Sequence, residues 1–149
     1  MTISTNVRAS VLLSEALELF RQGQNDRASM KVIEHLHKHR DDPRALALLG
    51  EIAQESGAFV QAESFLRRAI AFGATSHEVQ RNLASVILQQ DRLDEALAMF
   101  TELERRVDDL HLTATRAVIL DRLGRTQESI ATHERVIANP RAEPRHWIM

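Results

Sequence analysis

The sequence predicts an all-α chain, and its residue usage and hydrophobic pattern support this. Good helix formers (Ala, Leu, Glu, Gln and Arg) dominate the 149 residues, and the alternation of β-branched residues that is typical of strands is missing. Apolar residues recur three and four positions apart, as in Leu46, Leu49 and Ile52, and this spacing gives a helix one apolar face. We therefore expect helices along the whole chain.

Two repeating series divide these helices into pairs. A small residue recurs at spacings of 34, 34 and 33 in the series Ala28, Ala62, Ala96 and Ser129. Such a period marks the points where two helices approach too closely for a larger side chain. The matching turn series is Gly23, Gly57, Asp91 and Gly124. Gly, or an Asp that tolerates the left-handed conformation, suits a tight turn between paired helices.

The period predicts a flexible N-terminus over 1–8 and four helix pairs over 9–140, in units 9–42, 43–76, 77–109 and 110–140. Asp42 before Pro43 is typical of a helix N-cap with proline in the first turn. Thr75 and Glu78 have the spacing of a capping box at the next boundary. Residues 141–149 form a tail or the first part of a fifth unit.

The second and third units resemble the tetratricopeptide repeat (TPR) family. The second unit reads Leu46-x-x-Leu49-Gly50-x-x-Ala53, then Gly57, then Ala62-x-x-x-Leu66-x-x-Ala69. The third reads Gln80-x-x-Leu83-Ala84-x-x-Ile87, then Ala96-x-x-x-Phe100-x-x-Leu103. This resemblance implies a right-handed α-solenoid, or superhelix, of four antiparallel helix pairs plus the start of a fifth.

The first and fourth units depart from the family pattern. Glu15 and Arg116 occupy the customary leucine site, and His133 lies where an apolar residue is usual. We expect His133 to lie at a helix interface. Trp147 follows Thr113 by 34 residues, at a site where these repeats favour tryptophan. One hypothesis is that the chain is a fragment of a longer protein; the alternative is a natural tail whose Trp147 folds back onto the last helix pair.

Composition and charge exclude several classes of function. Nineteen Lys and Arg residues against 21 Asp and Glu residues give a net charge of -2, whereas nucleic-acid and anionic-membrane binders normally carry a basic excess. The absence of cysteine excludes disulfides and thiolate chemistry. There is no signal-peptide block or membrane-length apolar run, so we expect a cytoplasmic protein.

No catalytic motif is present, and no cofactor is predicted. The chain lacks a phosphate-binding glycine loop, Gly-x-Ser-x-Gly and His-Glu-x-x-His. His35 and His39 share a helix face at the spacing of two zinc ligands, but Lys38 adds a repelling charge and no third ligand is evident. They are weak candidates, and we expect no metal site.

Stacked helix pairs create a concave face that commonly holds a peptide or a partner helix. The family's groove positions, transferred to this sequence, give a candidate binding surface of mixed charge. Its residues are Leu13, Leu17, Arg44, Glu51, Glu55, Glu78, Arg81, Asn82, Ser85, Gln89, Thr115 and Arg122. The chaperone-binding members of the family grip a carboxylate with polar groove residues; Leu13 and Leu17 cannot donate hydrogen bonds, which argues against that clamp here.

The predicted function is a non-catalytic scaffold that binds a protein or peptide partner in this groove. Two alternatives remain open. The chain is similar in style to bacterial proteins in which such repeats precede a sulfotransferase domain, so it could be the accessory region of a larger enzyme. It could also be a homo-oligomeric scaffold that dimerises through the uncapped C-terminal end at Trp147.

Overall fold

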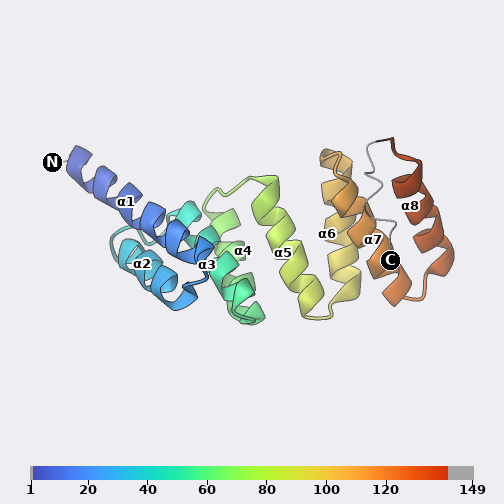
Figure 1. Ribbon diagram of the computed structural model, residues 1–149, viewed down its shortest axis with the longest axis horizontal. Coiled ribbons are helices and arrows are strands. Elements are labelled where there is room, and N and C mark those ends of the chain that lie inside the picture. The colour runs from blue at the N-terminus through green and yellow to red at the C-terminus, as the bar shows by residue number, and fades with distance from the viewer. Residues whose placement is uncertain (1, 141–149) are drawn as a thin grey trace. The chain divides into compact units, whose positions relative to one another are not determined.

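The computed structural model describes residues 2–140, with side chains from residue 11 onward; Trp147 and the predicted tail lie outside these residues. Within this range the chain forms eight α-helices and no strand. Their bounds are α1 (Thr2–Arg21), α2 (Asn25–Lys38), α3 (Pro43–Glu55), α4 (Phe59–Ala71), α5 (His77–Gln89), α6 (Leu93–Arg106), α7 (Leu110–Arg122) and α8 (Thr126–Ala138) (Figure 1). The predicted all-α architecture of helix pairs is confirmed. Helix α1 begins at Thr2, so the structure has helix where the sequence predicted a flexible segment over 1–8.

The chain divides into two compact units between Val86 and Ile87, inside α5, and each is described by itself. In the first unit α1 packs on α2 and α3 packs on α4, while α3 also contacts α1 and α2. Its core contains the fully buried Ala16, Ala28, Val32 and Ala45. In the second unit α7 packs against both α6 and α8.

The predicted small-residue series lies in the interior. Ala28, Ala62 and Ala96 are completely buried, and Ser129 is 3% exposed. The hydroxyl of Ser129 in α8 donates a hydrogen bond of 2.9 Å to the carbonyl of Ala117 in α7. The repeat period therefore identified the sites where paired helices approach closely.

The turns between paired helices share one backbone structure. Gly57 has φ of +76°, and Asp91 takes the same left-handed region at +61° without being a glycine. After Gly57, the N–H of Ala58 bonds to the carbonyl of Ala53, which is the Schellman arrangement that ends a helix. The prediction that an Asp replaces Gly in the third turn is confirmed.

The helix boundaries were partly predicted. Asp42 is the N-cap of α3 and accepts a hydrogen bond of 3.0 Å from the N–H of Arg44. The predicted cap at Thr75 is wrong, because α5 begins at His77 and the hydroxyl of Ser76 accepts the bond from Val79. A one-residue shift of this kind follows from two adjacent hydroxyl residues, each a good cap.

The two charged residues at the customary leucine site, Glu15 and Arg116, form ion pairs. Arg116, at the leucine site of α7, lies 2.6 Å from the carboxylate of Glu104 in α6, and both side chains are largely buried. Thr113 and Arg135 also contact Glu104. Glu15 remains at the surface and pairs with Lys31 across the first hairpin. His133 is exposed, and Thr132 is buried in its place, so the expected interface histidine is wrong.

No helix within residues 2–140 combines the length and apolar character needed to cross a bilayer.

Candidate functional site

A hollow of about 460 Å³ in the first unit brings together part of the predicted groove. Helices α1, α3 and α5 contribute to its lining. The lining residues are Leu13, Ser14, Leu17, Arg21, Arg44, Ala47, Leu48, Glu51 and Glu78. Five of these were predicted from the sequence: Leu13, Leu17, Arg44, Glu51 and Glu78. We call this set of lining residues the α1–α3–α5 groove.

Helical periodicity places these side chains on one face of each helix. Leu13, Leu17 and Arg21 follow one another at intervals of four on α1, and Leu48 follows Arg44 by four on α3. Leu17 is 37% exposed, while Leu13 and Leu48 are half-buried. The groove therefore offers an accessible apolar strip with charged side chains beside it.

Two carboxylates of the groove lining, those of Glu51 and Glu78, lie near enough to repel each other. Burial raises the pKa of Glu51, and the nearby charge of Glu78 raises it further. Asn82 donates a hydrogen bond of 3.2 Å to Oε1 of Glu51. Because Asn82 is neutral, this bond orients the carboxylate without cancelling its charge.

Arg44, the basic residue at the rim of the groove, forms an ion pair with Asp42. Its Nη2 lies 3.2 Å from Oδ2 of Asp42, and the Arg44 side chain is 75% exposed. Burial favours the neutral form of Asp42, but hydrogen bonds from Arg44 and His35 outweigh this effect and lower the pKa of Asp42. Arg44 is thus anchored at the start of α3 by the same carboxylate that caps the helix.

The remaining predicted groove residues lie outside this hollow. On α5, Arg81, Asn82 and Ser85 are half-buried, and Glu55 is exposed at the end of α3. The others belong to the second unit, described by itself: Gln89, Thr115 and Arg122. The Thr115 hydroxyl donates to the carbonyl of His111 in its own helix, and Arg122 pairs with Asp91 at 2.5 Å.

The two histidines weakly suggested for metal binding form a structural cluster instead. The rings of His35 and His39 stack with centroids 4.8 Å apart. His35 is buried, and its Nε2 lies 2.9 Å from Oδ2 of Asp42. In the part of the chain whose side chains are described, no three His, Asp or Glu residues are grouped so that they could hold a metal ion.

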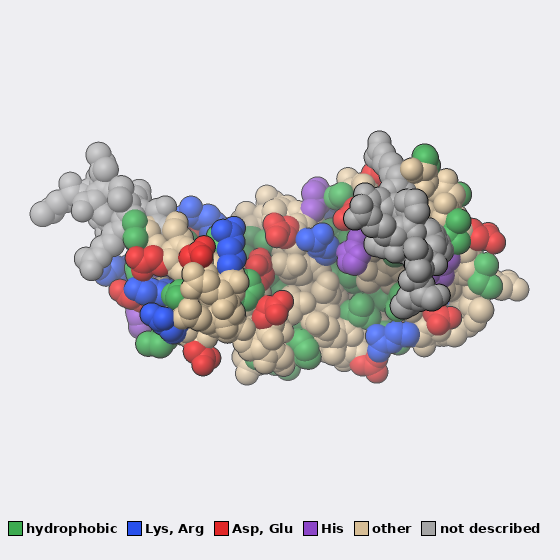
Figure 2. Space-filling view, viewed as in Figure 1, with side chains coloured by type: hydrophobic (Ala, Val, Ile, Leu, Met, Phe, Trp, Pro, Cys, Tyr) green, Lys and Arg blue, Asp and Glu red, His purple; other side chains and the backbone are tan. Residues whose placement is uncertain are grey.

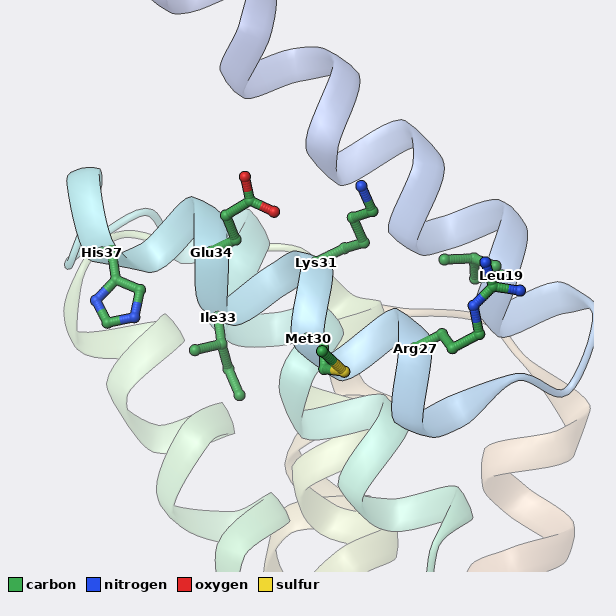
Figure 3. Close-up of a pocket in the computed structure, with 7 residues that line it drawn as sticks. All are labelled: Leu19, Arg27, Met30, Lys31, Ile33, Glu34 and His37. Atoms are coloured by element: carbon green, nitrogen blue, oxygen red, sulfur yellow. The ribbon is translucent and has the colours of Figure 1, made fainter.

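A second hollow, of about 510 Å³, lies along α2 and was missed by the sequence analysis. It is lined by Leu19, Arg27, Met30, Lys31, Ile33, Glu34 and His37 (Figure 3). Met30 is 70% exposed and Ile33 is 46% exposed. The sequence does contain a signal for this hollow. Met30, Ile33 and His37 are spaced by three and four, and they lie on a different face of α2 from the buried Ala28 and Val32.

A third hollow, of about 580 Å³, shares Ile33 and His37 with the second and reaches Phe65 of α4. Its lining mixes apolar side chains with Arg40 and two serines. On the face in view in Figure 2, basic and acidic side chains alternate over the surface. This interspersed pattern is unlike the one-signed basic surface of a nucleic-acid-binding protein.

Comparison with known proteins finds a family that resembles part of this chain. The family model described as tetratricopeptide repeat matches residues 13–78, which include every residue of the α1–α3–α5 groove. A search of curated proteins found no match.

Solved structures share the fold. A mutant O-GlcNAc transferase from Thermobaculum terrenum is 26% identical over 80% of this chain, with a TM-score of 0.72; the match spans 23% of that protein. YrrB, described as a TPR protein with an unusual peptide-binding site, is 15% identical (TM-score 0.77; 91% of this chain and 69% of that one). MamA from Desulfovibrio magneticus is 14% identical (TM-score 0.79; 87% and 73%). Residues 13–78 therefore match the tetratricopeptide repeat family, and the solved structures share the all-α fold of helix pairs.

Proposed function

We propose that this chain is a non-catalytic interaction scaffold whose α1–α3–α5 groove binds a peptide or helix of a partner protein. The observation that carries the proposal is the convergence of five predicted groove residues on one hollow. They come from three helices and from sequence positions as far apart as Leu13 and Glu78. An accessible apolar strip with a few charged groups beside it is the usual composition of a binding site.

The mode of binding follows from the lining. Covering Leu13, Leu17 and Leu48 with apolar atoms of a partner removes their exposed surface from water, which favours association by about 25 cal/mol per Å². The charges at the rim supply orientation and discriminate between partners more than they add affinity. Rigid paired helices hold the lining residues in place before the partner arrives, which reduces the entropy lost on binding.

The comparisons support this kind of function. YrrB, a TPR protein that shares this fold, has an unusual peptide-binding site. MamA has the same fold over most of its length. Because YrrB and MamA are only 15% and 14% identical to this chain, they support the fold alone. The argument for binding comes from the groove.

A second candidate function is that of an accessory region in a larger enzyme. The observation in its favour is the match to 23% of the O-GlcNAc transferase, whose chain is much longer than this one. In that arrangement the groove would position a protein substrate. Two alternatives remain predictions. The reading frame beyond Met149 tests whether a sulfotransferase domain follows this chain. Light scattering tests whether the chain forms a homodimer through Trp147.

The experiment is a selection of random twelve-residue peptides on the whole chain, followed by fluorescence anisotropy with each selected peptide. Leu17→Glu should weaken groove-binding peptides at least about tenfold, because a charge would then occupy the apolar strip. Met30→Glu is the matched control, since it places the same charge on an exposed apolar residue of the second hollow. Peptides that bind Leu17→Glu as tightly as the wild type, but lose affinity for Met30→Glu, would place the function on α2 instead.

A further inference from the structure

We propose that the α1–α3–α5 groove selects peptide segments in which a Lys or Arg side chain neighbours an apolar side chain. The cation would lie against the carboxylates of Glu51 and Glu78, and the apolar side chain would lie on the strip that contains Leu17. This inference rests on the proposed function and adds the chemical class of the partner.

The first argument is the charge at the α5 side of the groove. The charged neighbour that acts on Glu51 is another acid, Glu78, and the hydrogen-bond donor at its Oε1 is the neutral amide of Asn82. A carboxylate can accept about four hydrogen bonds, so the bond from Asn82 leaves capacity for a cationic donor. A Lys or Arg side chain of a partner would relieve the repulsion between Glu51 and Glu78.

The second argument is that the basic rim residue Arg44 is already matched. Its guanidinium lies 3.2 Å from Oδ2 of Asp42 and its Nε lies 3.4 Å from Oδ1 of the same group. The carboxylate of Asp42 is 12% exposed, so this pairing is partly shielded from water. Arg44 therefore extends toward solvent at the start of α3 with its charge compensated. Arg21, the other cation of the lining, lies on α1, whereas the charge that acts on Glu51 is that of Glu78, so a cation is favoured at the two carboxylates on α3 and α5.

The third argument is the apolar strip beside the carboxylates. Leu13 and Leu17 lie one helical turn apart on α1, and Ala47 and Leu48 continue the apolar lining on α3. Glu51 follows Leu48 by three residues and so lies on the same face of α3. A partner that fills this surface must present apolar and cationic groups side by side. An acidic peptide or a nucleic acid would bring negative charge toward Glu51 and Glu78 and is disfavoured.

The test uses the peptides selected on the whole chain and retains those that lose affinity for Leu17→Ala. This variant shortens the apolar strip without adding a negative charge that would itself attract a cationic peptide. We expect these groove-dependent peptides to be enriched in Lys or Arg next to Leu, Ile, Phe or Met. Replacing the Lys or Arg of such a peptide by Gln should raise its dissociation constant about tenfold, as should Glu51→Gln in the protein. Glu134→Gln is the control, since it removes the same charge from an exposed site in α8. Raising the salt concentration should weaken binding to the wild type more than binding to Glu51→Gln.

The outcomes separate this inference from the proposed function. Groove-dependent peptides that are uncharged or acidic, or that bind Glu51→Gln as tightly as the wild type, would overturn the inference and leave the groove as a binding site. If no selected peptide depends on Leu17, the proposed function fails and the inference fails with it.

Discussion

Nε2 of the buried His35 in α2 lies 2.9 Å from Oδ2 of Asp42, whose other carboxylate oxygen accepts the N–H of Arg44 at the start of α3. One carboxylate thus joins the first helix pair to the second. It satisfies a buried ring nitrogen and a free helix N–H at the same time, and it anchors Arg44 at the rim of the groove.

Replacing Asp42 by Ala should destabilise the protein by about 1–3 kcal/mol, because both the N-cap and the partner of a buried imidazole are lost. Urea unfolding followed by circular dichroism measures the change. Asp41→Ala is the matched control, since Asp41 is exposed, and its effect should stay within about 0.5 kcal/mol. Equal effects of the two substitutions would show that the His35–Asp42 contact contributes nothing.

The same carboxylate should make stability depend on acid. Although burial opposes ionisation, the hydrogen bonds from Arg44 and His35 bring the pKa of Asp42 below its ordinary value of 3.8. A carboxyl group whose pKa is lowered by folding stabilises the protein above its unfolded-state pKa, and this contribution is lost as the pH falls through the folded-state value. The stability difference between wild type and Asp42→Asn should therefore shrink between about pH 5 and pH 2. A stability difference that stays constant over this pH range would show that the charge of Asp42 does not stabilise the folded protein.

Gly50→Ala should destabilise the protein, although Gly→Ala in an exposed helix interior normally stabilises by about 0.5–1 kcal/mol. A Cβ at Gly50 would lie 2.7 Å from Cγ and 2.8 Å from Cδ2 of the buried Leu66 in α4. Overpacking of this kind costs about 1–3 kcal/mol. In a double-mutant cycle by urea unfolding, Leu66→Ala should relieve part of the cost of Gly50→Ala. Additive effects would mean that α3 and α4 are not in this close contact.

Ala62→Leu tests the small-residue series in the same way and should cost about 1–3 kcal/mol. Ala62 is completely buried, whereas Ala71 near the end of the same helix is exposed. Ala71→Leu should therefore be tolerated within about 0.5 kcal/mol. Thermal unfolding of the two variants measures the contrast, and two equally mild effects would refute the proposed helix crossing.

Removing only one partner of the Arg116–Glu104 ion pair should destabilise the protein more than removing both. Glu104→Leu leaves the largely buried Arg116 without its partner at 2.6 Å and should destabilise by about 1–3 kcal/mol. Adding Arg116→Leu restores the customary apolar residue and should recover part of that loss. Urea unfolding of the single and double variants measures their free energies of unfolding. A double variant that is less stable than Glu104→Leu would contradict this prediction.

Glu51→Gln should raise stability at neutral pH even as it weakens peptide binding. Burial and the charge of Glu78 raise the pKa of Glu51, so its charged form is unfavourable in the folded protein. For a pKa raised by folding, the favourable contribution is complete below the unfolded-state pKa and is lost as pH rises through the folded-state value. The advantage of Glu51→Gln over wild type should therefore disappear in acid. An unchanged melting temperature at pH 7 would contradict the claim that the charged form of Glu51 is unfavourable in the folded protein.

The fold could be predicted because its signals are local and repeated. Each close crossing leaves a small residue such as Ala62, and each left-handed turn leaves a Gly or Asp such as Asp91. Five of the groove residues taken from the family's groove positions line one hollow, because those positions fall on one face of each helix. The cap at Ser76 was missed because Thr75 offers nearly the same chemistry one residue earlier.

Other features depend on contacts between distant residues, which no spacing reveals. The network of Glu104 with Thr113, Arg116 and Arg135 joins three helices. The orientation of Glu51 by Asn82 spans 31 residues. Met30 and Ile33 of the second hollow do follow helical spacing, but spacing alone does not distinguish a hollow from any other exposed helix face.

The central claim is that partners bind in the α1–α3–α5 groove, and methyl NMR of the whole chain titrated with a selected peptide tests it most directly. We expect the largest shifts at the methyl groups of Leu13, Leu17 and Leu48, with Met30 and Ile33 unchanged. Shifts confined to Met30 and Ile33 would contradict the account and place recognition at the second hollow, along α2.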